Sequence, residues 1–435
     1  MIFKLKTVPA RLKAQAKLGH LAWVTVIFVV AVTARSLWVA HTHADPFADA
    51  QFYDRAAASL AEGKGYLNIF TQTATALWPP GYSFLLAAFY RVFGSHLSIA
   101  WGINIVLGAL TCALLYVIGN LIGGRKVGVL AGLTLALLPG HVFYSSIVLS
   151  EVLFTFLAVA VMTLILWAVR KSAPGPPLLI VIGVLVGASA LVRGQGLLLI
   201  FVAGLFWWLY THDWARSLQW ATVVMLTALA VIVPWSIRNY FAMKEFIFIS
   251  TNDGVNLYMG NHEGASGGFE YGAGGSITEQ FGYLPPNEQE AKSSNVMMRE
   301  GLRFMFTHPI DELGLTWSKL RYLYQSDDDS LVWIEAPEAG KPLANRQLLA
   351  DVLNDSYFAV LAFAGVGLYS FRRRLRGAVS LPLIFVGVFT LGQMPFFGMS
   401  RFHYPMLPSF ALMAAAGMVS AVGYLRSRWK RLGAS

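Results

Sequence analysis

The sequence predicts an all-α membrane protein whose helices cross the bilayer many times. Of its 435 residues, 56% are hydrophobic and only 13% are charged, whereas an average soluble domain has about 25% charged residues. Apolar runs of bilayer-spanning length recur along the whole chain. Because backbone polar groups cannot stay unpaired in lipid, runs of this length indicate transmembrane helices.

The basic residues lie in short clusters at the ends of the apolar runs. The clusters are Arg125–Lys126, Arg170–Lys171, Arg372–Arg376 and Arg426–Arg431. This is the positive-inside pattern, so we expect anionic lipid, and not nucleic acid, to balance the net charge of +10. The one cysteine, Cys112, lies inside an apolar run, which excludes an internal disulfide and a cysteine metal cluster.

These clusters also predict the topology. The apolar run 21–40 follows a basic stretch, so we interpret it as a retained first helix with a cytoplasmic N-terminal flank. Residues 80–94 are too few for a full span, and a crossing there would place Arg125 and Lys126 outside; we expect an interfacial segment. Ten spans and two cytoplasmic termini follow. After the first, they are expected near 97–122, 127–140, 150–169, 177–192, 196–211, 217–236, 356–371, 379–397 and 404–425.

The spans divide the chain into three regions. Residues 1–236 form a transmembrane module with a first outer loop at 41–96. Residues 237–355 form a polar, glycine-rich outer region, long enough for a small cap. Residues 356–435 carry the C-terminal spans. A short outer turn is expected at 139–151, and the internal repeats of many transporters are not evident.

The first outer loop predicts an amphipathic helix. Asp45 followed by Pro46 is typical of an N-cap with proline at the first helical position. The helix should run to about Glu62, where Gly63 or Gly65 supplies a left-handed cap.

Asp49 is the acidic residue of this helix that best fits a catalytic role. Tyr53 lies four residues later on the same face. A helix N-terminus favours the ionised carboxylate, which is the form a general base needs. Asp54 and Arg55 are expected to face water. From the residues alone, a solvated helix start remains an alternative for Asp49.

Glu151 and two arginines are further candidates near the outer ends of spans. Glu151 is either a functional intramembrane acid or part of a helix cap with Ser150. Arg193 and Arg401 depart from the positive-inside pattern. Each either snorkels to headgroups or binds a phosphate with its guanidinium fork; His403 and Tyr404 beside Arg401 favour the second interpretation there.

The second outer loop offers weaker candidates. Arg238, at its start, is a possible substrate contact or an interfacial anchor. Asn256 and Tyr258 suit sugar hydroxyls, although turn chemistry explains this stretch equally well. His41 and His43 lie near Asp45 in sequence, so a divalent metal is conceivable, but histidines at this spacing arise readily by chance. No phosphate-binding loop, zinc-protease or nucleophile-elbow motif occurs.

Six segments together resemble a known family. In order they are Asp49-x-x-x-Tyr53 with "LAEGKGY", "WPPGYSFLLAAFYRVFG", "LSEVLFTF", "ALVRGQGLLL", "PWSIRNYFAMKEFIFISTNDGVNLYMGN" and "RFHYPMLP". Over residues 20–425 the chain resembles the GT-C superfamily of membrane glycosyltransferases. The branch it resembles is bacterial family 39, related to protein O-mannosyltransferases and the lipid A aminoarabinose transferase.

The resemblance implies a GT-C helical bundle, a polyprenyl-phosphate sugar donor and inverting transfer of a hexosyl or pentosyl group. Transfer would occur on the outer face of a bacterial inner membrane, to a lipid, glycan or protein acceptor. It implies that Asp49 is the base, that Glu151 is a second acid near the site, and that Arg401 faces the donor phosphate. Ala50 after Asp49 and Trp78 before the proline pair depart from the family pattern, which leaves donor contacts and metal use open. The alternative function is a transporter or flippase of a lipid-linked glycan, which would need charged residues deep in the spans.

Overall fold

The structure is a computed structural model that describes residues 10–42, 45–169, 174–335, 343, 345–372 and 377–432. Its regular elements are all helices, apart from one isolated bridge between Leu67 and Ala74. In chain order, the helices of the first half are α1 (Ala10–His41), α2 (Ala48–Ala61), α3 (Gly81–Phe93), α4 (Leu97–Gly123), α5 (Arg125–Leu137), α6 (Pro139–Phe143), η1 (Tyr144–Ser146), α7 (Glu151–Val169), α8 (Pro176–Val192), η2 (Gly194–Leu197), α9 (Leu198–Thr211) and α10 (Trp214–Met243). The second half has α11 (Asn252–Gly260), α12 (Gly275–Glu279), α13 (Pro286–Thr307), α14 (Pro309–Tyr324), α15 (Asp329–Ile334), α16 (Arg346–Phe371), α17 (Ser380–Gln393), η4 (Ser400–Met406) and α18 (Leu407–Leu432).

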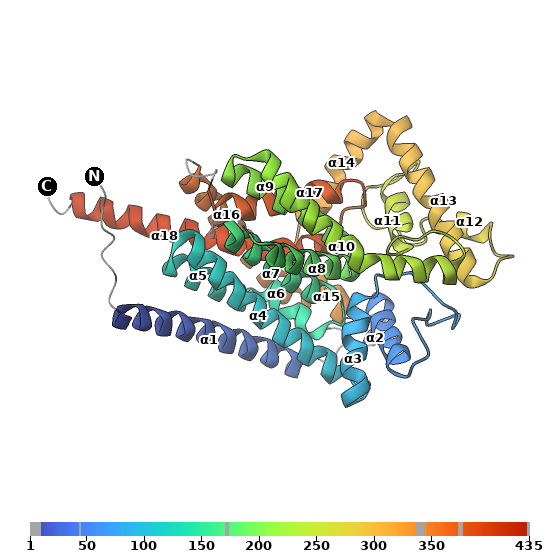
Figure 1. Cartoon of the computed structure of the whole chain (residues 1–435), viewed down its shortest axis with the longest axis horizontal. Coiled ribbons are helices and arrows are strands. Elements are labelled where there is room, and N and C mark those ends of the chain that lie inside the picture. Colours follow the sequence, from blue (N-terminus) through green and yellow to red (C-terminus); the bar gives the residue numbers. More distant parts are fainter. Residues whose placement is uncertain are drawn as a thin grey trace.

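The long helices run side by side along one axis and form the bundle (Figure 1). Among the described residues, seven helical segments are long and apolar enough to cross a membrane, and the pair α5 and α6–η1, bent by 59°, makes an eighth. Ten spans were expected from the sequence, so two or three of them do not meet this criterion. Helices α8 and α17 have 17 and 14 residues, or about 25 and 21 Å at 1.5 Å per residue, which is less than a bilayer core of about 30 Å.

The two outer loops lie at the same end of the bundle. Figure 1 shows α2, α3 and α11 to α14 at one end and both chain termini toward the other. Helix α3 packs against α2 and is not among the candidate spans, which agrees with the interfacial position expected for residues 80–94. Three of the predicted basic stretches fall wholly or partly outside the described residues: 170–171, 373–376 and the side chains after 426.

Local sequence explains where several of these helices begin. Prolines occupy the first turn of α6, α8, α13 and α14, where a missing backbone N–H costs nothing. The Asp213 carboxylate accepts the backbone N–H of Arg216 at 3.0 Å and caps α10. The predicted cap at Asp45 is wrong, because α2 begins only at Ala48. Phe47 precedes it with an extended backbone and stacks on Trp333 with ring centroids 5.2 Å apart.

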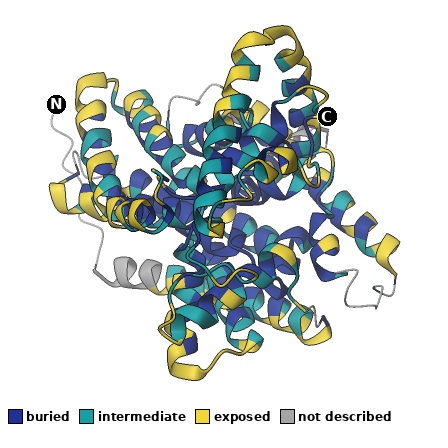
Figure 2. Ribbon diagram, turned by 90° about the vertical axis from the view of Figure 1, so that its right-hand side faces the viewer, coloured by how far each residue is buried: buried dark blue, intermediate teal, exposed yellow. Residues whose placement is uncertain are grey.

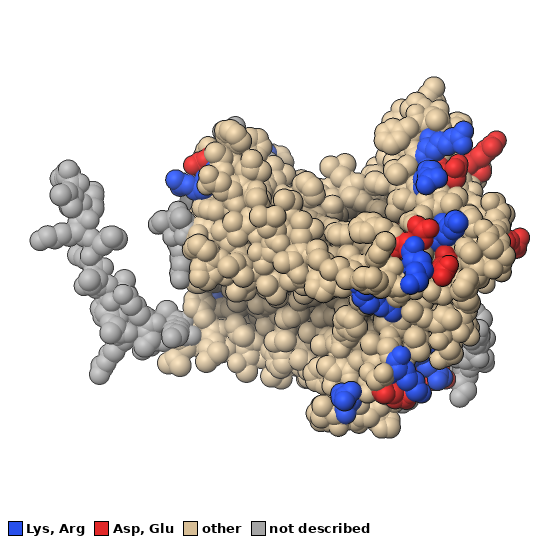
Figure 3. All heavy atoms as spheres, turned by 45° about the vertical axis from the view of Figure 1, so that its right-hand side comes forward, with Lys and Arg blue, Asp and Glu red and all other residues tan. Residues whose placement is uncertain are grey.

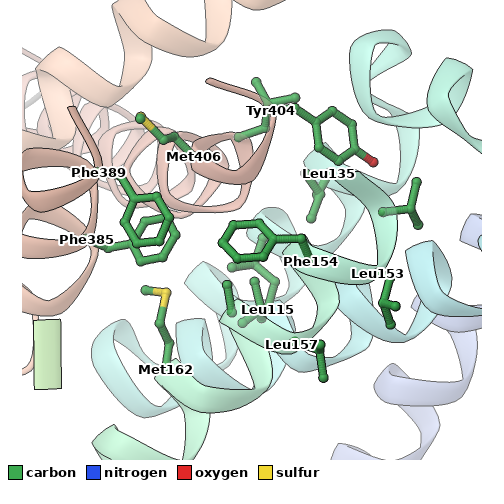
Figure 4. Packing of buried hydrophobic residues seen from close by; sticks show 14 of the residues in the cluster. Leu115, Leu135, Leu153, Phe154, Leu157, Met162, Phe385, Phe389, Tyr404 and Met406 are labelled. Atoms are coloured by element: carbon green, nitrogen blue, oxygen red, sulfur yellow. The ribbon is translucent and has the colours of Figure 1, made fainter. Parts of the chain in front are cut away.

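A continuous apolar core fills the bundle and ends beneath the outer loops. In an end-on view, the buried residues occupy the centre and the exposed ones the rim (Figure 2). Phe154 of α7 packs against Phe389 of α17 with centroids 5.9 Å apart, and Tyr404 and Met406 of η4 lie beside them (Figure 4). These side chains hold η4 against the apolar core.

The first helix also carries a charge that the sequence analysis overlooked. Arg35 of α1 is fully buried. It lies 2.5 Å from His141 Nδ1 and donates to the carbonyl oxygens of Ala31 and Ala136 at 3.0 and 3.3 Å. An intramembrane cation needs such acceptors. Arg35 is thus a buried charge within the predicted span 21–40.

Helices α16 and α18 pack closely at two glycines. A Cβ atom on Gly417 would overlap the Phe363 carbonyl oxygen, and one on Gly367 would overlap that of Met413. We expect Gly417→Val to destabilise the protein by about 1–3 kcal/mol, because the helices must separate to accept the larger side chain. Thermal unfolding in detergent measures this. Gly423→Val on the same helix is the control, since a Cβ there meets nothing within 4 Å; equal midpoints for the two variants would contradict the prediction.

Candidate functional site

Four charged residues that are far apart in sequence meet at the end of the bundle that holds the outer loops. Asp49 comes from α2, Glu151 from the start of α7, Arg193 from the end of α8 and Arg401 from η4. They form a chain of ion pairs with nitrogen–oxygen distances of 2.7–3.0 Å. We call these four residues the ion cluster. These pairs can form only if the four helix ends lie on the same side of the membrane, which is where the predicted topology places them.

Glu151 is the centre of the ion cluster. Its Oε1 lies 2.7 Å from Arg193 Nη1 and 2.8 Å from Arg401 Nε. Its side chain is only 1% exposed. As the first residue of α7, it also lies at the positive end of that helix dipole. The sequence left a functional role and a capping role open; in the structure Glu151 opens α7 and binds both arginines.

Asp49 is the more accessible acid of the ion cluster. Its Oδ2 accepts hydrogen bonds from Arg401 Nη1 and Nη2, both at 3.0 Å. Its side chain is 20% exposed, in contrast to the sealed Glu151. Both hydrogen bonds from Arg401 end on Oδ2, so the second carboxylate oxygen, Oδ1, has no contact with this arginine.

Tyr53 and Ser150 connect α2 to Arg193. The Tyr53 hydroxyl donates to Ser150 Oγ at 3.4 Å, and Arg193 Nη1 donates to the same oxygen at 3.2 Å. Burial raises the pKa of Tyr53 to about 12. The phenol therefore stays neutral at physiological pH and serves as a hydrogen-bond donor.

The short helix α15 covers one side of the ion cluster. The Arg401 guanidinium carbon lies 4.8 Å from the Trp333 ring centroid, a cation–π distance. Asp329 Oδ2 accepts from Trp333 Nε1 at 3.1 Å and from the Tyr144 hydroxyl at 3.2 Å. Burial raises the pKa of Asp329 above its ordinary value.

Neither arginine of the ion cluster snorkels to headgroups. Arg193 and Arg401 are mostly buried, and both guanidinium groups bind acids. Arg193 also lies over the Phe402 ring, 5.7 Å from its centroid. In the structure the partners of these two guanidinium groups are therefore the two acids.

Other residues singled out from the sequence have different partners. Arg238 donates to the carbonyl oxygens of Thr75 and Tyr66 at 2.6 and 3.0 Å, so it fastens the first outer loop to the end of α10. Tyr258 of α11 stacks on His262 with centroids 5.1 Å apart. Asn256 lies half-buried on the same helix.

His403 and Tyr404 belong to neighbouring networks. His403 Nδ1 donates to the Leu323 carbonyl oxygen at 2.7 Å, and Nε2 lies 2.9 Å from Asp327 Oδ1. Tyr404 stacks between His141 and Tyr144, with centroids 5.0 and 4.3 Å away. Both residues position η4, which carries Arg401.

Sequence reasoning missed Asp329 and Trp333, although a signal was there. Three consecutive aspartates, Asp327–Asp329, lie within the predicted outer region 237–355 of a chain with few acids. Two of the three are buried. The expectation that Asp54 faces water was also wrong, because its Oδ1 accepts the Tyr90 hydroxyl at 2.6 Å and joins α2 to α3.

Within the described part of the chain, no group of three or more histidine, cysteine or acidic side chains is arranged to hold a metal ion. His43, one of the two histidines considered for such a site, lies outside the described residues. His41 Nδ1 lies 2.7 Å from the Leu37 carbonyl oxygen at the end of α1.

Comparisons with known proteins give two kinds of match. Residues 78–237 match the family model described as dolichyl-phosphate-mannose-protein mannosyltransferase. No curated protein matches the sequence. Among solved structures, the oligosaccharyltransferase AglB from Archaeoglobus fulgidus, in complex with an inhibitory peptide and a dolichol-phosphate, has a TM-score of 0.60 at 15% identity. That match covers 97% of this chain and 52% of AglB, so the chain spans about half the length of that enzyme.

Two further structures are similar. The Archaeoglobus fulgidus oligosaccharyltransferase in complex with Zn and sulfate has a TM-score of 0.58 at 14% identity, covering 93% of this chain and 50% of the other. ArnT from Cupriavidus metallidurans, bound to undecaprenyl phosphate, has a TM-score of 0.49 at 14% identity, covering 91% of this chain and 78% of ArnT.

The burial of Glu151 predicts different effects of removing the two acids. Glu151→Gln leaves two mostly buried guanidinium groups with one carboxylate between them, and breaking a buried ion pair costs about 3–5 kcal/mol. Asp49→Asn removes a more accessible charge, and Glu151 still binds both arginines. We therefore expect Glu151→Gln to lower the thermal unfolding midpoint in detergent well below that of Asp49→Asn. A smaller shift for Glu151→Gln would mean that the ion cluster does not stabilise the fold.

Proposed function

We propose that this chain, which has the fold of the GT-C membrane glycosyltransferases, is an inverting glycosyltransferase that uses a polyprenyl-phosphate-linked sugar. Transfer would take place on the outer face of a bacterial cytoplasmic membrane, to a lipid, glycan or protein acceptor. One observation carries the proposal: a part-exposed carboxylate, Asp49, is bound to a guanidinium that a buried glutamate holds in place.

The two arginines are the proposed donor-phosphate contacts. The phosphate of a lipid-linked sugar gains negative charge as it leaves the anomeric carbon, and fixed cations stabilise that charge. A guanidinium matches phosphate oxygens through paired N–H groups. Glu151 lies 2.7 Å from one guanidinium group and 2.8 Å from the other, so a buried carboxylate already holds both cations at the site before the donor binds.

Asp49 is the proposed general base. In the proposed step the acceptor hydroxyl or amine attacks the anomeric carbon, and its proton passes to Asp49. The bond from the anomeric carbon to the phosphate oxygen breaks, and its electron pair leaves with the phosphate. Attack opposite the leaving group inverts the anomeric centre, so the sugar would bind between the base and the arginines, which requires the pair of Asp49 and Arg401 to open.

The ion pair between Asp49 and Arg401 implies that the donor binds before Asp49 can accept a proton. While Arg401 binds Asp49, the carboxylate is occupied on Oδ2. A donor phosphate competes for the same guanidinium and would release Asp49 toward the acceptor. Arg401 would keep its direction through Nε, which faces Glu151.

The similar proteins support the donor class. The family model is named for a dolichyl-phosphate-linked sugar, and the AglB structure contains dolichol-phosphate. Dolichol-phosphate is a polyprenol phosphate, the class of lipid proposed for this chain. In the described residues the cationic partners for such a phosphate are the two arginines of the ion cluster.

Asp49→Asn should abolish transfer and leave the protein folded, because the amide cannot accept the acceptor proton. The readout is mass spectrometry of cell-envelope glycans from cells that lack the protein, complemented with each variant. Asp45→Asn is the matched control, since Asp45 is an exposed aspartate in the same loop, and it should restore the glycans fully. Restoration by Asp49→Asn would rule out this base.

Arg401→Lys should weaken the binding of undecaprenyl phosphate to the purified protein. A lysine ammonium cannot contact Glu151 with one nitrogen and present two further nitrogens in a planar fork. Asp49→Asn should retain the binding or strengthen it, because it frees the guanidinium. Unchanged binding in Arg401→Lys would show that the phosphate contacts other residues.

A further inference from the structure

Helix α14 exposes an apolar face. Ile310, Leu313 and Trp317 are between 72% and 82% exposed. Their spacing of three and four residues places them on one side of the helix. Phe306, near the end of α13, is 82% exposed and extends the same kind of surface across the turn at His308. We call these four residues the hairpin face.

The opposite side of α14 holds the charged residues that a soluble helix would expose. Lys319 is fully buried. Its Nζ donates to Glu312 Oε1 at 2.8 Å and to Asn261 Oδ1 at 2.7 Å. A helix in water usually buries its largest apolar side chains and exposes its ion pairs. Helix α14 buries Leu315 and Leu323, but it also buries the pair of Lys319 and Glu312 while the hairpin face stays exposed. A contiguous apolar surface of this kind marks a binding interface.

The position of the helix indicates what covers the hairpin face. The Tyr324 hydroxyl at the end of α14 hydrogen-bonds Thr390 of α17, and Gly398 packs against the Lys319 backbone. The helix therefore joins the bundle at the outer end of the apolar helix α17. Figure 1 shows α13 and α14 projecting sideways there, at the same end as α2 and α3.

The charges of the hairpin are distributed accordingly. In Figure 3, charged side chains lie on the side of the projecting hairpin away from the chain termini, and uncharged atoms cover the side toward them. Exposed Arg321, one turn beyond Trp317, lies where a cation reaches headgroups.

We propose that the hairpin of α13 and α14 lies in the outer interface of the membrane, with the hairpin face inserted among lipid acyl chains. Aromatic and aliphatic side chains on one side of a helix, and charges on the other, suit this interface. The lipid would fix the height of the second outer loop, which carries Trp333 and Asp329 to the ion cluster. The proposal is independent of the reaction catalysed.

Spin labels in liposomes test this directly. We would label Leu313→Cys and, as the matched control, Asp311→Cys, an exposed residue on another side of the same helix. The one native cysteine, Cys112, is fully buried. The full chain would be placed in phosphatidylcholine vesicles, and collisions with oxygen and with a water-soluble nickel chelate would be compared by electron paramagnetic resonance.

The label at Leu313 should collide more with oxygen than with the nickel chelate, and the label at Asp311 should show the reverse. A Leu313 label that prefers the nickel chelate would mean that the hairpin face lies in water. A Leu313 label shielded from both reagents would mean that a protein surface covers it. Either outcome overturns the proposal.

Discussion

The buried carboxylate of Glu151 is the constraint on which the outer end of this protein depends. It binds Arg193 of α8 and Arg401 of η4, and Arg401 in turn binds Asp49 of α2. A guanidinium taken out of water without an acid is strongly unfavourable, so each segment is held where its charge finds a partner. Two arginines and two acids balance one another. The segments from the first loop, two spans and the C-terminal region thereby converge on one point, and η4 is secured from below by Tyr404 and Met406 in the apolar core.

Glu151 and Asp49 differ in burial, and this difference suits them to different roles in the ion cluster. Glu151 is sealed and contacts both arginines, which suits an acid that orients cations. Asp49 is more accessible and uses only one oxygen toward Arg401, which suits an acid that can exchange partners. The short helix α15 contributes Trp333, which lies over Arg401 and stacks on Phe47 at the start of α2.

The membrane environment accounts for polarity that would be unfavourable in a soluble protein. Arg35 is buried within α1 among carbonyl oxygens and a histidine. Helix α14 carries its ion pair inward and its tryptophan outward. Charged groups within a span must be paired inside the protein, as Arg35 is. The proposed contact of α14 with lipid would account for its exposed tryptophan. The fold is similar to that of the oligosaccharyltransferase AglB, and residues 78–237 match a mannosyltransferase family model, as the resemblance drawn from the sequence implied.

The sequence by itself determined the class of protein and the position of most helices, because run length and proline positions are local properties; the interfacial place of α3 stays a prediction. It also identified Asp49, Glu151, Arg193 and Arg401 one by one, as charges that needed a reason to lie at the outer ends of spans. Only the tertiary structure decided that these four meet, since Asp49 and Arg401 are 352 positions apart and their pairing depends on how the helices pack. It turned His403 toward Asp327, brought Asp329 and Trp333 to the ion cluster, and tied Arg238 to the first outer loop. Which charges pair in a low-dielectric interior is set by distances between elements, and no local pattern encodes those distances.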